Sequence, residues 1–301
     1  MIEDIFFQDE GQVKITAASV GISRLRWTSV KESEINSNIH LELMWKNRFD
    51  HLPIEPETGT ITEFFKTVKP NKFDKIERLK INYNDVIPLD TNIRDVIDKF
   101  ANQKKTFFFL RYQKSICGLI TLGNLNCKQV QIYIFSLICD LEKELGDYLN
   151  SKLTDKEIKE WINGKIDVSN PNDKYKLILE NYENLTNSDL ENRLTEHFFL
   201  VDFFKIISDK NIYSEFGYTK SGWEDLSSIN ELRKRIAHPT RSLIDNENNI
   251  FKLQKRINKI EDLTFRLTTR KQNSSRQQHL PKSGGSVVKS SFVHLSKFVL
   301  G

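Results

Sequence analysis

The chain has 301 residues, enough for two ordinary domains, of which 38% are hydrophobic and 29% charged. This composition is typical of a globular protein and argues against a membrane-embedded or wholly disordered chain. The formal net charge is +4, but six of the 45 cations and none of the 41 acids lie in residues 269–301, so residues 1–268 carry −2. A broad nucleic-acid-binding surface is therefore not expected, and any RNA contact must rest on a local site.

The apolar runs and cysteines point to no membrane or secretory protein. The first ten residues carry acids where a secretory signal would carry Lys or Arg, and the longest apolar run, residues 130–139, has half the length of a membrane helix. Cys117, Cys127 and Cys139 form no C-x-x-C pair and have no matching His cluster. We therefore expect a cytoplasmic protein with no membrane partner, no disulfide framework and no metal site.

Residues 35–66 and 90–121 are two copies of one sequence unit. Each copy has an amphipathic helix, in which Leu41 and Met44 of the first copy correspond to Ile97 and Phe100 of the second. Two short strands separated by a turn follow, at residues 51–54 and 61–66 in the first copy and at 107–110 and 116–121 in the second. Apolar and β-branched strands that alternate with helices predict an α/β unit. Residues 1–127 are therefore expected to fold as two like α/β repeats.

The second copy, about residues 82–127, is the better preserved and resembles the CBS domain. Residues 85–97 (DVIPLDTNIRDVI) are similar to the family's opening strand and helix, and residues 118–125 (GLITLGNL) to its closing turn. Tandem CBS pairs form a nucleotide-sensing (Bateman) module. The resemblance implies two repeats of β-α-β-β-α type, with an adenine nucleotide (AMP, ADP, ATP or a related one) as regulatory ligand.

The resemblance also implies which residues hold the nucleotide: Gly118, Thr121 and Asn124 in the second copy. A glycine lets backbone approach the ligand, and a threonine hydroxyl both donates and accepts. Asn124 stands where the family has an aspartate, so its amide donates where a carboxylate would accept from ribose. In the first copy Lys66 occupies the threonine position and suits a phosphate. The alternative is that both copies form a dimerising scaffold without a ligand.

From Lys128 onward the pattern of apolar residues is helical. It predicts helices over about residues 128–150, 155–162, 188–207, 221–237 and 247–267, with a loop at 168–173. These elements predict an all-α bundle of four or five helices over residues 128–268. Residues 269–301 are rich in Ser, Gln, Lys and Gly and predict a basic, disordered tail.

The helix predicted over residues 221–237 carries one cation on its apolar side. At 100° per residue, Arg233 falls among apolar residues such as Ile229, and a half-buried charge needs a partner. Asp202 lies on the apolar face of another predicted helix, so Arg233 or His238 is its expected partner. His238 precedes Pro239, which disfavours helical geometry at the residue before it, so the imidazole can leave the helix axis.

Residues 232–239 (LRKRIAHP) resemble the motif of the HEPN family, an Arg and a His four to six residues apart on the third helix of a small bundle. Many HEPN proteins are metal-independent endoribonucleases whose active site forms where two protomers meet. The resemblance implies a homodimer, an RNA substrate and no cofactor for catalysis. His238 would be the general base or acid and Arg233 would bind the phosphate, with Asp202 a further candidate. Lys234 departs from the family, which often has Asn after the Arg.

Two functional interpretations follow. In the first, a CBS-type sensor controls a HEPN-like effector that is a metal-independent endoribonuclease. In the second, the chain is a non-catalytic regulatory or dimerisation adaptor with an RNA- or protein-binding helical domain. Arg233 and Asp202 would then be only a buried ion pair, and His238 would cap its helix.

Overall fold

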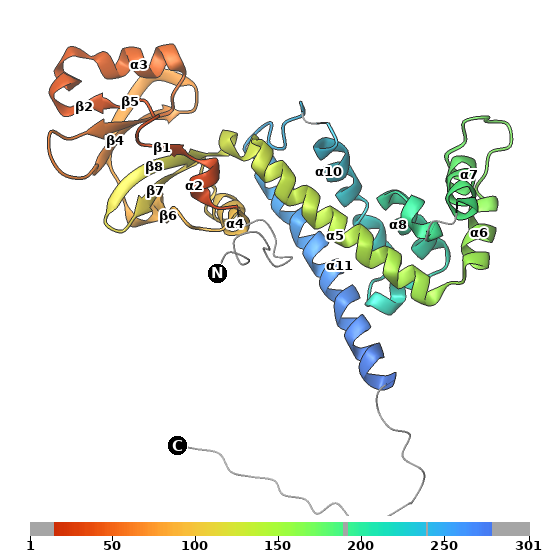
Figure 1. Cartoon of the computed structure of the whole chain (residues 1–301). Helices are drawn as coiled ribbons and strands as arrows, with labels where there is room; N and C mark the ends of the chain where they lie inside the picture. The colour runs from red at the N-terminus through yellow and green to blue at the C-terminus, as the bar shows by residue number, and fades with distance from the viewer. Residues whose placement is uncertain (1–14, 189–191, 239, 279–301) are drawn as a thin grey trace, which may run out of the picture.

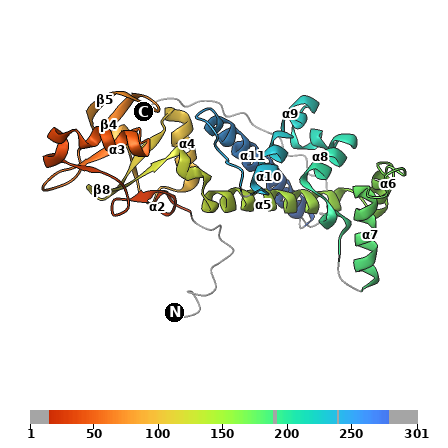
Figure 2. The ribbon, with the colours of Figure 1, turned by 90° about the horizontal axis from the view of Figure 1, so that it is seen from above.

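The computed structural model describes residues 15–188, 192–238 and 240–278. A mixed α/β half is followed by a half that is entirely helical (Figure 1). Seen from above, the α/β half lies at one end of the long helix α5 (Lys128–Lys152), and α6 and α7 lie at the other end (Figure 2). The chain is therefore elongated, and α5 connects its two ends.

Each repeat builds one four-stranded sheet around a parallel pair of strands that a helix connects. In the first repeat these are β2 (Val30–Lys31), α3 (Ile39–Asn47) and β3 (His51–Glu55); in the second they are β6 (Val86–Pro88), α4 (Ile93–Gln103) and β7 (Phe107–Tyr112). An antiparallel strand follows in each, β4 (Glu63–Lys69) beside β3 and β8 (Ser115–Thr121) beside β7. This shared topology confirms the prediction of two like α/β repeats.

The repeats differ from the expected β-α-β-β-α order at their edges. In the first, β4 is followed by another strand, β5 (Lys72–Lys80), rather than by a helix. In the second, β1 (Ile22–Ser23) pairs antiparallel with β8, so the N-terminal segment completes the sheet of the distant repeat. The remaining short elements of this half are α2 (Ala17–Val20), η1 (Glu32–Ser37), η2 (Tyr83–Asp85) and η3 (Leu122–Asn126).

Three clusters of buried apolar residues hold these elements together. Phe64 of the first repeat and Phe107 and Phe109 of the second share one cluster, which joins the repeats. Met44 of α3 belongs to a smaller cluster within the first repeat. The largest cluster includes α2 and α4, which buries Phe100, and continues through the helical half. The element boundary near Lys128 therefore does not interrupt the core.

The helical half is built around α5 and α11, which run side by side in the same direction away from the second repeat (Figure 1). Its elements after α5 are α6 (Asp155–Asn163), α7 (Lys174–Asn187), η4 (Leu194–His197), α8 (Leu200–Asp209), η5 (Ile212–Phe216), α9 (Lys220–Asp225), α10 (Ser228–Ile236) and α11 (Asn249–Gln278). No helix in the described ranges combines the length and apolarity that crossing a membrane requires.

Several predicted helix bounds in this half are wrong. The predicted helix over residues 188–207 is instead η4 and α8, with Phe198 and Phe199 extended between them, because the Asp202 carboxylate accepts from the Phe199 N–H at 3.2 Å and starts α8 there. The predicted helix over 221–237 is two helices, α9 and α10. The helix α7, which was not predicted, begins where the Asp173 side chain accepts from two backbone N–H groups.

The prediction places the start of the disordered tail too early in the sequence. Helix α11 continues to Gln278, so the first ten residues of the tail predicted over 269–301 are helical. The rest of that prediction, residues 279–301, lies outside the described residues.

Candidate functional site

A cavity of about 380 Å³ lies between the two repeats. The N-terminal segment contributes Ile22, Arg26, Trp27 and Thr28, the first repeat contributes residues 48–51, and the second contributes Thr106, Phe107, Leu119 and Thr121. The volume falls within the range of roughly 300–1,000 Å³ that small-molecule sites occupy. Of the four residues predicted to bind nucleotide, this wall includes Thr121.

Thr121 and Asn124 form one hydrogen-bonded turn at the end of β8. The Thr121 backbone N–H and the Thr121 hydroxyl donate to Asn124 Oδ1 at 2.8 Å and 2.9 Å. The Asn124 carbonyl oxygen therefore starts the 3₁₀ turn η3 and orients the Thr121 hydroxyl beside the cavity. Asn124 is not part of the cavity wall, so its role here is to hold Thr121.

Gly118 and Lys66 lie outside the cavity wall. A Cβ at position 118 would stand 2.6 Å from the Ile22 carbonyl oxygen, so the pairing of β1 with β8 requires a glycine at this position. Lys66 is exposed on β4, where it is the register partner of His51. The structure brings Thr121 to the cavity but leaves Gly118 on β8 and Lys66 on β4 outside its wall.

The charged groups of the cavity are Arg26, Arg48 and Asp50, and sequence reasoning missed all three. Asp50 Oδ1 already accepts from the Thr67 hydroxyl at 2.8 Å and from the Asn71 N–H at 2.7 Å, which ties the carboxylate to the β4–β5 hairpin. The two exposed guanidinium groups therefore give the cavity a positive character that suits an anionic ligand.

His51 adds a neutral aromatic ring to the wall. Its centroid lies 3.6 Å from that of Phe107, and its Nε2 is buried without a hydrogen-bond partner. Burial, followed by the positive charge of Lys66, lowers the pKa of His51 to about 3, against a weaker opposing effect of Asp85. The imidazole therefore stays uncharged at neutral pH.

In the helical half, Arg233 pairs with an acid that the sequence did not indicate. Arg233 Nε donates to Glu142 Oε1 of α5 at 2.8 Å, and the Arg233 side chain is 29% exposed. Its guanidinium carbon also lies 5.6 Å from the ring centre of Phe199, within cation–π range. The prediction that Arg233 is half-buried and partnered is confirmed, but the partner is Glu142.

Asp202 is fully buried and belongs to a different cluster. Its carboxylate pairs with Lys174 and accepts from the Tyr175 hydroxyl at 3.1 Å, and it caps α8 at Phe199. Burial and this carboxylate together raise the pKa of Tyr175 well above its usual range. The predicted pairing of Asp202 with Arg233 or His238 is therefore wrong, because α7, which was not predicted, supplies its partners.

His238 lies one residue beyond the C-cap of α10 and is exposed. Its backbone N–H donates to the Arg235 carbonyl at 3.3 Å, while its imidazole makes no hydrogen bond or ion pair with a described residue. The neighbouring cations are engaged, since Lys234 pairs with Glu231 and Arg235 with Asp245, both at short range. Pro239 lies outside the described residues.

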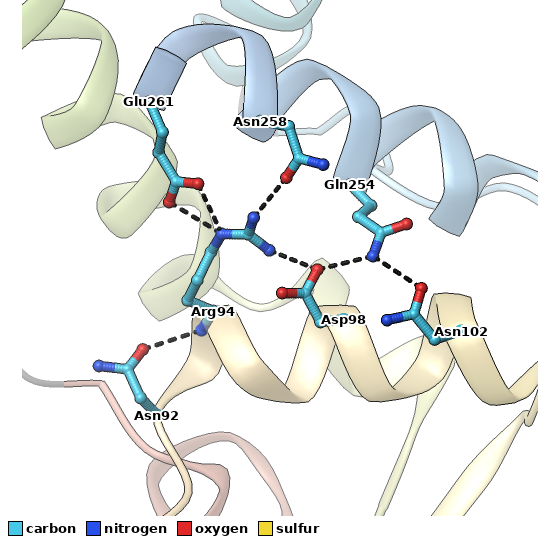
Figure 3. Close-up of polar contacts among 7 residues, drawn as sticks. All are labelled: Asn92, Arg94, Asp98, Asn102, Gln254, Asn258 and Glu261. Atoms are coloured by element: carbon cyan, nitrogen blue, oxygen red, sulfur yellow. Dashed lines mark hydrogen bonds and ion pairs between the residues drawn. The ribbon is translucent and has the colours of Figure 1, made fainter. Parts of the chain in front are cut away.

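A polar network joins the second repeat to the helical half (Figure 3). Arg94 of α4 donates to Glu261 of α11 at 2.8 Å and 3.0 Å, pairs with Asp98 at 2.6 Å, and also contacts Asn258. Gln254 of α11 donates to Asp98 at 2.7 Å. With its side chain 19% exposed, Arg94 is the central residue of this contact between α4 and α11.

No family model and no curated protein matches this chain. Solved structures with some similarity include CBS-domain proteins. CBSX2 in complex with AMP is 16% identical over 39% of this chain and 97% of that chain, with a TM-score of 0.30. The CBS domains of a transcriptional regulator from Streptococcus pneumoniae are 17% identical over 36% of this chain and 92% of that chain, with a TM-score of 0.28. A hemolysin-like CBS protein of Oenococcus oeni PSU is 14% identical (37% and 88%, TM-score 0.28).

The strand order, the parallel strand pair and the connecting helix of each repeat make the N-terminal half two like α/β repeats.

Proposed function

We propose that the α/β half is a CBS-type sensor of adenine nucleotides and that it regulates the helical half, a HEPN-like effector. The observation that carries the proposal is the cavity between the repeats, whose wall combines Thr121 with Arg26 and Arg48. This residue set matches the two ends of a nucleotide, because a hydroxyl suits ribose and guanidinium groups suit phosphate.

The aromatic side chains of the cavity suit the base. Trp27 and Phe107 line the same wall, and the uncharged His51 ring, which packs against Phe107, extends it. Flat apolar surfaces beside a small number of polar groups are typical of sites for heteroaromatic ligands. A ligand that fills this space would touch both repeats and would therefore favour one relative placement of them.

The contact between α4 and α11 supports a route by which such a change would reach the effector. Arg94 binds side chains of α11, and α4, α5 and α11 share one core. A shift of the second repeat must therefore either carry α11 with it or break the Arg94 network. A ligand that binds the two arrangements with different affinity would shift their populations by that difference.

For the effector we propose a metal-independent endoribonuclease whose active site is formed by residues of two protomers. His238 takes the proton of an RNA 2′-hydroxyl, the 2′-oxygen forms a bond to the adjacent phosphorus, and the P–O5′ bond breaks while the 5′-oxygen takes a proton from water. Arg233 would stabilise the charge that develops on the phosphate. Glu142 would be a positioning residue, since it holds the guanidinium from α5.

The surface beside Arg233 supports a homodimer. Ile132, Phe135 and Cys139 share one face of α5 and are exposed, and the ring under Arg233, Phe199, is 49% exposed. An apolar face of this kind on a monomer is typical of an association surface. A second copy seated there would place two Arg233 side chains near one groove. We infer that such a protein acts in the cytoplasm, where adenine nucleotides and RNA are both present.

Calorimetric titration with AMP, ADP and ATP tests the sensor. Binding by the full chain is expected for at least one nucleotide, and Arg26→Ala should weaken it about tenfold or more, since a charge-assisted hydrogen bond contributes roughly 1.5–3 kcal/mol. Arg241→Ala, an exposed arginine of the helical half, is the matched control and should bind as the parent does. Absence of binding by all three nucleotides would contradict the sensor assignment.

Incubation with a labelled RNA in excess EDTA tests the effector. The parent chain is expected to cleave, His238→Ala to lose cleavage, and Glu142→Gln to retain part of it, because the amide still accepts one hydrogen bond from Arg233. Equal cleavage by the parent and by His238→Ala would assign the activity to a contaminant.

The ion pair between Arg233 and Glu142 also favours a second candidate, a non-catalytic regulatory or dimerisation adaptor. A paired arginine at 2.8 Å explains the half-buried charge without chemistry. In this case no RNA is cut under any nucleotide, while nucleotide still changes the dimerisation constant.

A further inference from the structure

The first repeat carries a second hollow, where the end of α3 meets the tip of the β4–β5 hairpin; Arg48 lines both this hollow and the cavity between the repeats. Its volume is about 450 Å³, and it is lined by Trp45, Lys46, Arg48, Asn71 and Phe73. In Figure 1 this part of the chain, beside α3, lies at the end of the molecule farthest from α8 and α10. We call these five residues the α3 hollow. Its described lining contains two cations, two aromatic rings and no acid.

Trp45 is the unusual residue of the α3 hollow. It is 69% exposed on a nine-residue helix whose buried anchor is Met44, so packing of α3 does not require the indole. Leu41, one turn earlier on the same face, is 41% exposed. A large aromatic side chain left in water costs free energy that burial against a partner would recover.

The cations around the α3 hollow lack internal partners. Lys69 and Lys72 are register partners on β4 and β5, and like charges directly opposite each other destabilise a strand pair. Neither of them, nor Lys46 or Arg48 of the hollow, makes a side-chain hydrogen bond or ion pair with a described residue. The nearby Asp50 carboxylate accepts from Thr67 and Asn71 and forms no ion pair with these cations.

Two other cations on the same hairpin have acidic partners. Arg78 pairs with Glu63 and with Glu32, and Lys75 lies 3.7 Å from Glu77. Among the described residues, unpaired cations therefore gather at the hairpin tip and the end of α3, and Lys66 of β4 and Lys80 of β5 are unpaired cations farther along the same hairpin. In a chain body with a net charge of −2, this is a local positive patch built around an exposed indole.

We propose that the α3 hollow and the adjoining lysines bind single-stranded nucleic acid, with RNA as the expected form. One base stacks on Trp45, and Lys46, Lys69 and Lys72 contact successive phosphates. Stacking on an exposed aromatic ring beside a cationic track is how sequence-tolerant single-strand sites are built. The cations continue along the hairpin beyond the hollow, which favours a strand over a free nucleotide. A concave site of this volume accommodates a base, whereas a membrane anchor would present a convex apolar ridge.

This proposal requires neither nucleotide sensing nor cleavage, and Arg48 is the one residue that the α3 hollow shares with the cavity between the repeats. If the helical half does cut RNA, the α3 hollow would hold the strand at a distance from Arg233 and His238. If it does not, the hollow still makes the chain an RNA-binding protein. All binding measurements therefore use the full chain in a His238→Ala background, which prevents cleavage from obscuring the result.

Fluorescence anisotropy with a labelled 12-nucleotide U-rich RNA tests the assignment. Trp45→Ala should weaken binding about tenfold or more, as expected for one lost stacked base, and Trp45→Phe should restore most of the affinity. Lys46→Glu with Lys72→Glu should lower the slope of log K against log salt by at least ~1.4, or ~0.7 for each lost phosphate contact. Circular dichroism and the thermal midpoint confirm that each variant folds.

Matched controls come from the opposite half of the chain. Phe265 is 69% exposed, as Trp45 is, so Phe265→Ala removes an equally exposed ring and should leave binding unchanged. Lys156→Glu with Lys220→Glu reverses two exposed lysines with the same change in net charge. Equal losses in these controls and in the hollow variants would overturn the proposal, because they would reveal a net-charge effect.

Three further outcomes would overturn the assignment to a single strand. The first is wild-type affinity in Trp45→Ala and in the double lysine variant. The second is complete displacement of the labelled RNA from the full chain by AMP at concentrations near the dissociation constant of AMP, which would make the ligand a free nucleotide. The third is binding to phosphatidylserine vesicles that depends on Trp45 in the absence of any RNA binding, which would assign the surface to a membrane.

Discussion

His51 should make the α/β half less stable in mildly acidic solution. The imidazole lies in the wall between the repeats, packed against Phe107, and burial is the main cause that lowers its pKa to about 3. An unfolded chain has no such environment, so its histidine titrates near 6.5. Below that pH the unfolded state takes up a proton that the folded state does not. Stability is therefore complete above about pH 6.5 and is lost progressively as the pH falls toward 3.

The size of the loss follows from the two pKa values. At 1.36 kcal/mol per unit, lowering the pH from 7 to 5 should cost about 2 kcal/mol of unfolding free energy through His51 alone. His51→Phe removes the titrating group and places a ring like that of Phe107 at the equivalent position of the first repeat. The variant should therefore lack this part of the pH dependence.

Native-state hydrogen exchange of the β7 amides measures the relevant free energy, because β7 packs against the His51 ring. The difference in opening free energy between the parent and His51→Phe should change by about 2 kcal/mol from pH 7 to pH 5. Phe64→Leu, in the same aromatic cluster, is the non-titrating control and should show a pH-independent cost. In parallel, the ring nitrogens of His51 should show no titration by NMR above pH 5.

A constant difference between the parent and His51→Phe over this pH range would refute the reasoning. It would mean that the imidazole is solvated in the folded protein, or that it gains a compensating partner on protonation. Titration of the His51 ring near pH 6.5 would have the same consequence.

Four other substitutions, one of them a control, test the structure more locally. Arg94→Ala should lower the free energy of unfolding by about 2 kcal/mol, since it leaves Glu261 and Asp98 without their charged donor, and an unchanged urea midpoint would show that the network contributes nothing. Gly118→Ala should be strongly destabilising because its Cβ would meet a backbone oxygen at 2.6 Å, whereas Gly123→Ala, with its nearest contact at 3.6 Å, should be nearly neutral by thermal denaturation. Thr154→Ala should cost about 1 kcal/mol through loss of an N-cap, and a midpoint equal to that of the parent would contradict this.

Local sequence signals predicted the elements that local interactions determine. The helix α6 starts after Thr154, whose hydroxyl and backbone bond with Glu157 as the spacing of a capping box indicates. The amphipathic pattern likewise located α4, with Ile97 and Phe100 fully buried. In contrast, β5 was not among the predicted strands, because Phe73, Ile76 and Leu79 recur every third residue rather than every second.

Partners that are distant in sequence could not be predicted. Helical periodicity indicated that Arg233 and Asp202 are inward-facing charges, and both are partnered. The identity of each partner depends on which helix packs beside it: α5 supplies Glu142, 91 residues from Arg233, and α7 supplies Lys174, 28 residues from Asp202. The cavity arginines were missed for a similar reason, since Arg26 and Thr121 become neighbours only when the N-terminal segment crosses to the second sheet.

The uninterrupted helix α5 also sets the mechanical behaviour of the chain. Its 25 residues span roughly 37 Å at 1.5 Å per residue, from the end of the second repeat to the start of α6. A rigid rod of that length works as a lever: a tilt of about 5° at the repeat displaces the far end by ~3 Å. Small rearrangements around the cavity would thus be magnified along the rod, and a helix-breaking proline placed at its middle would interrupt it.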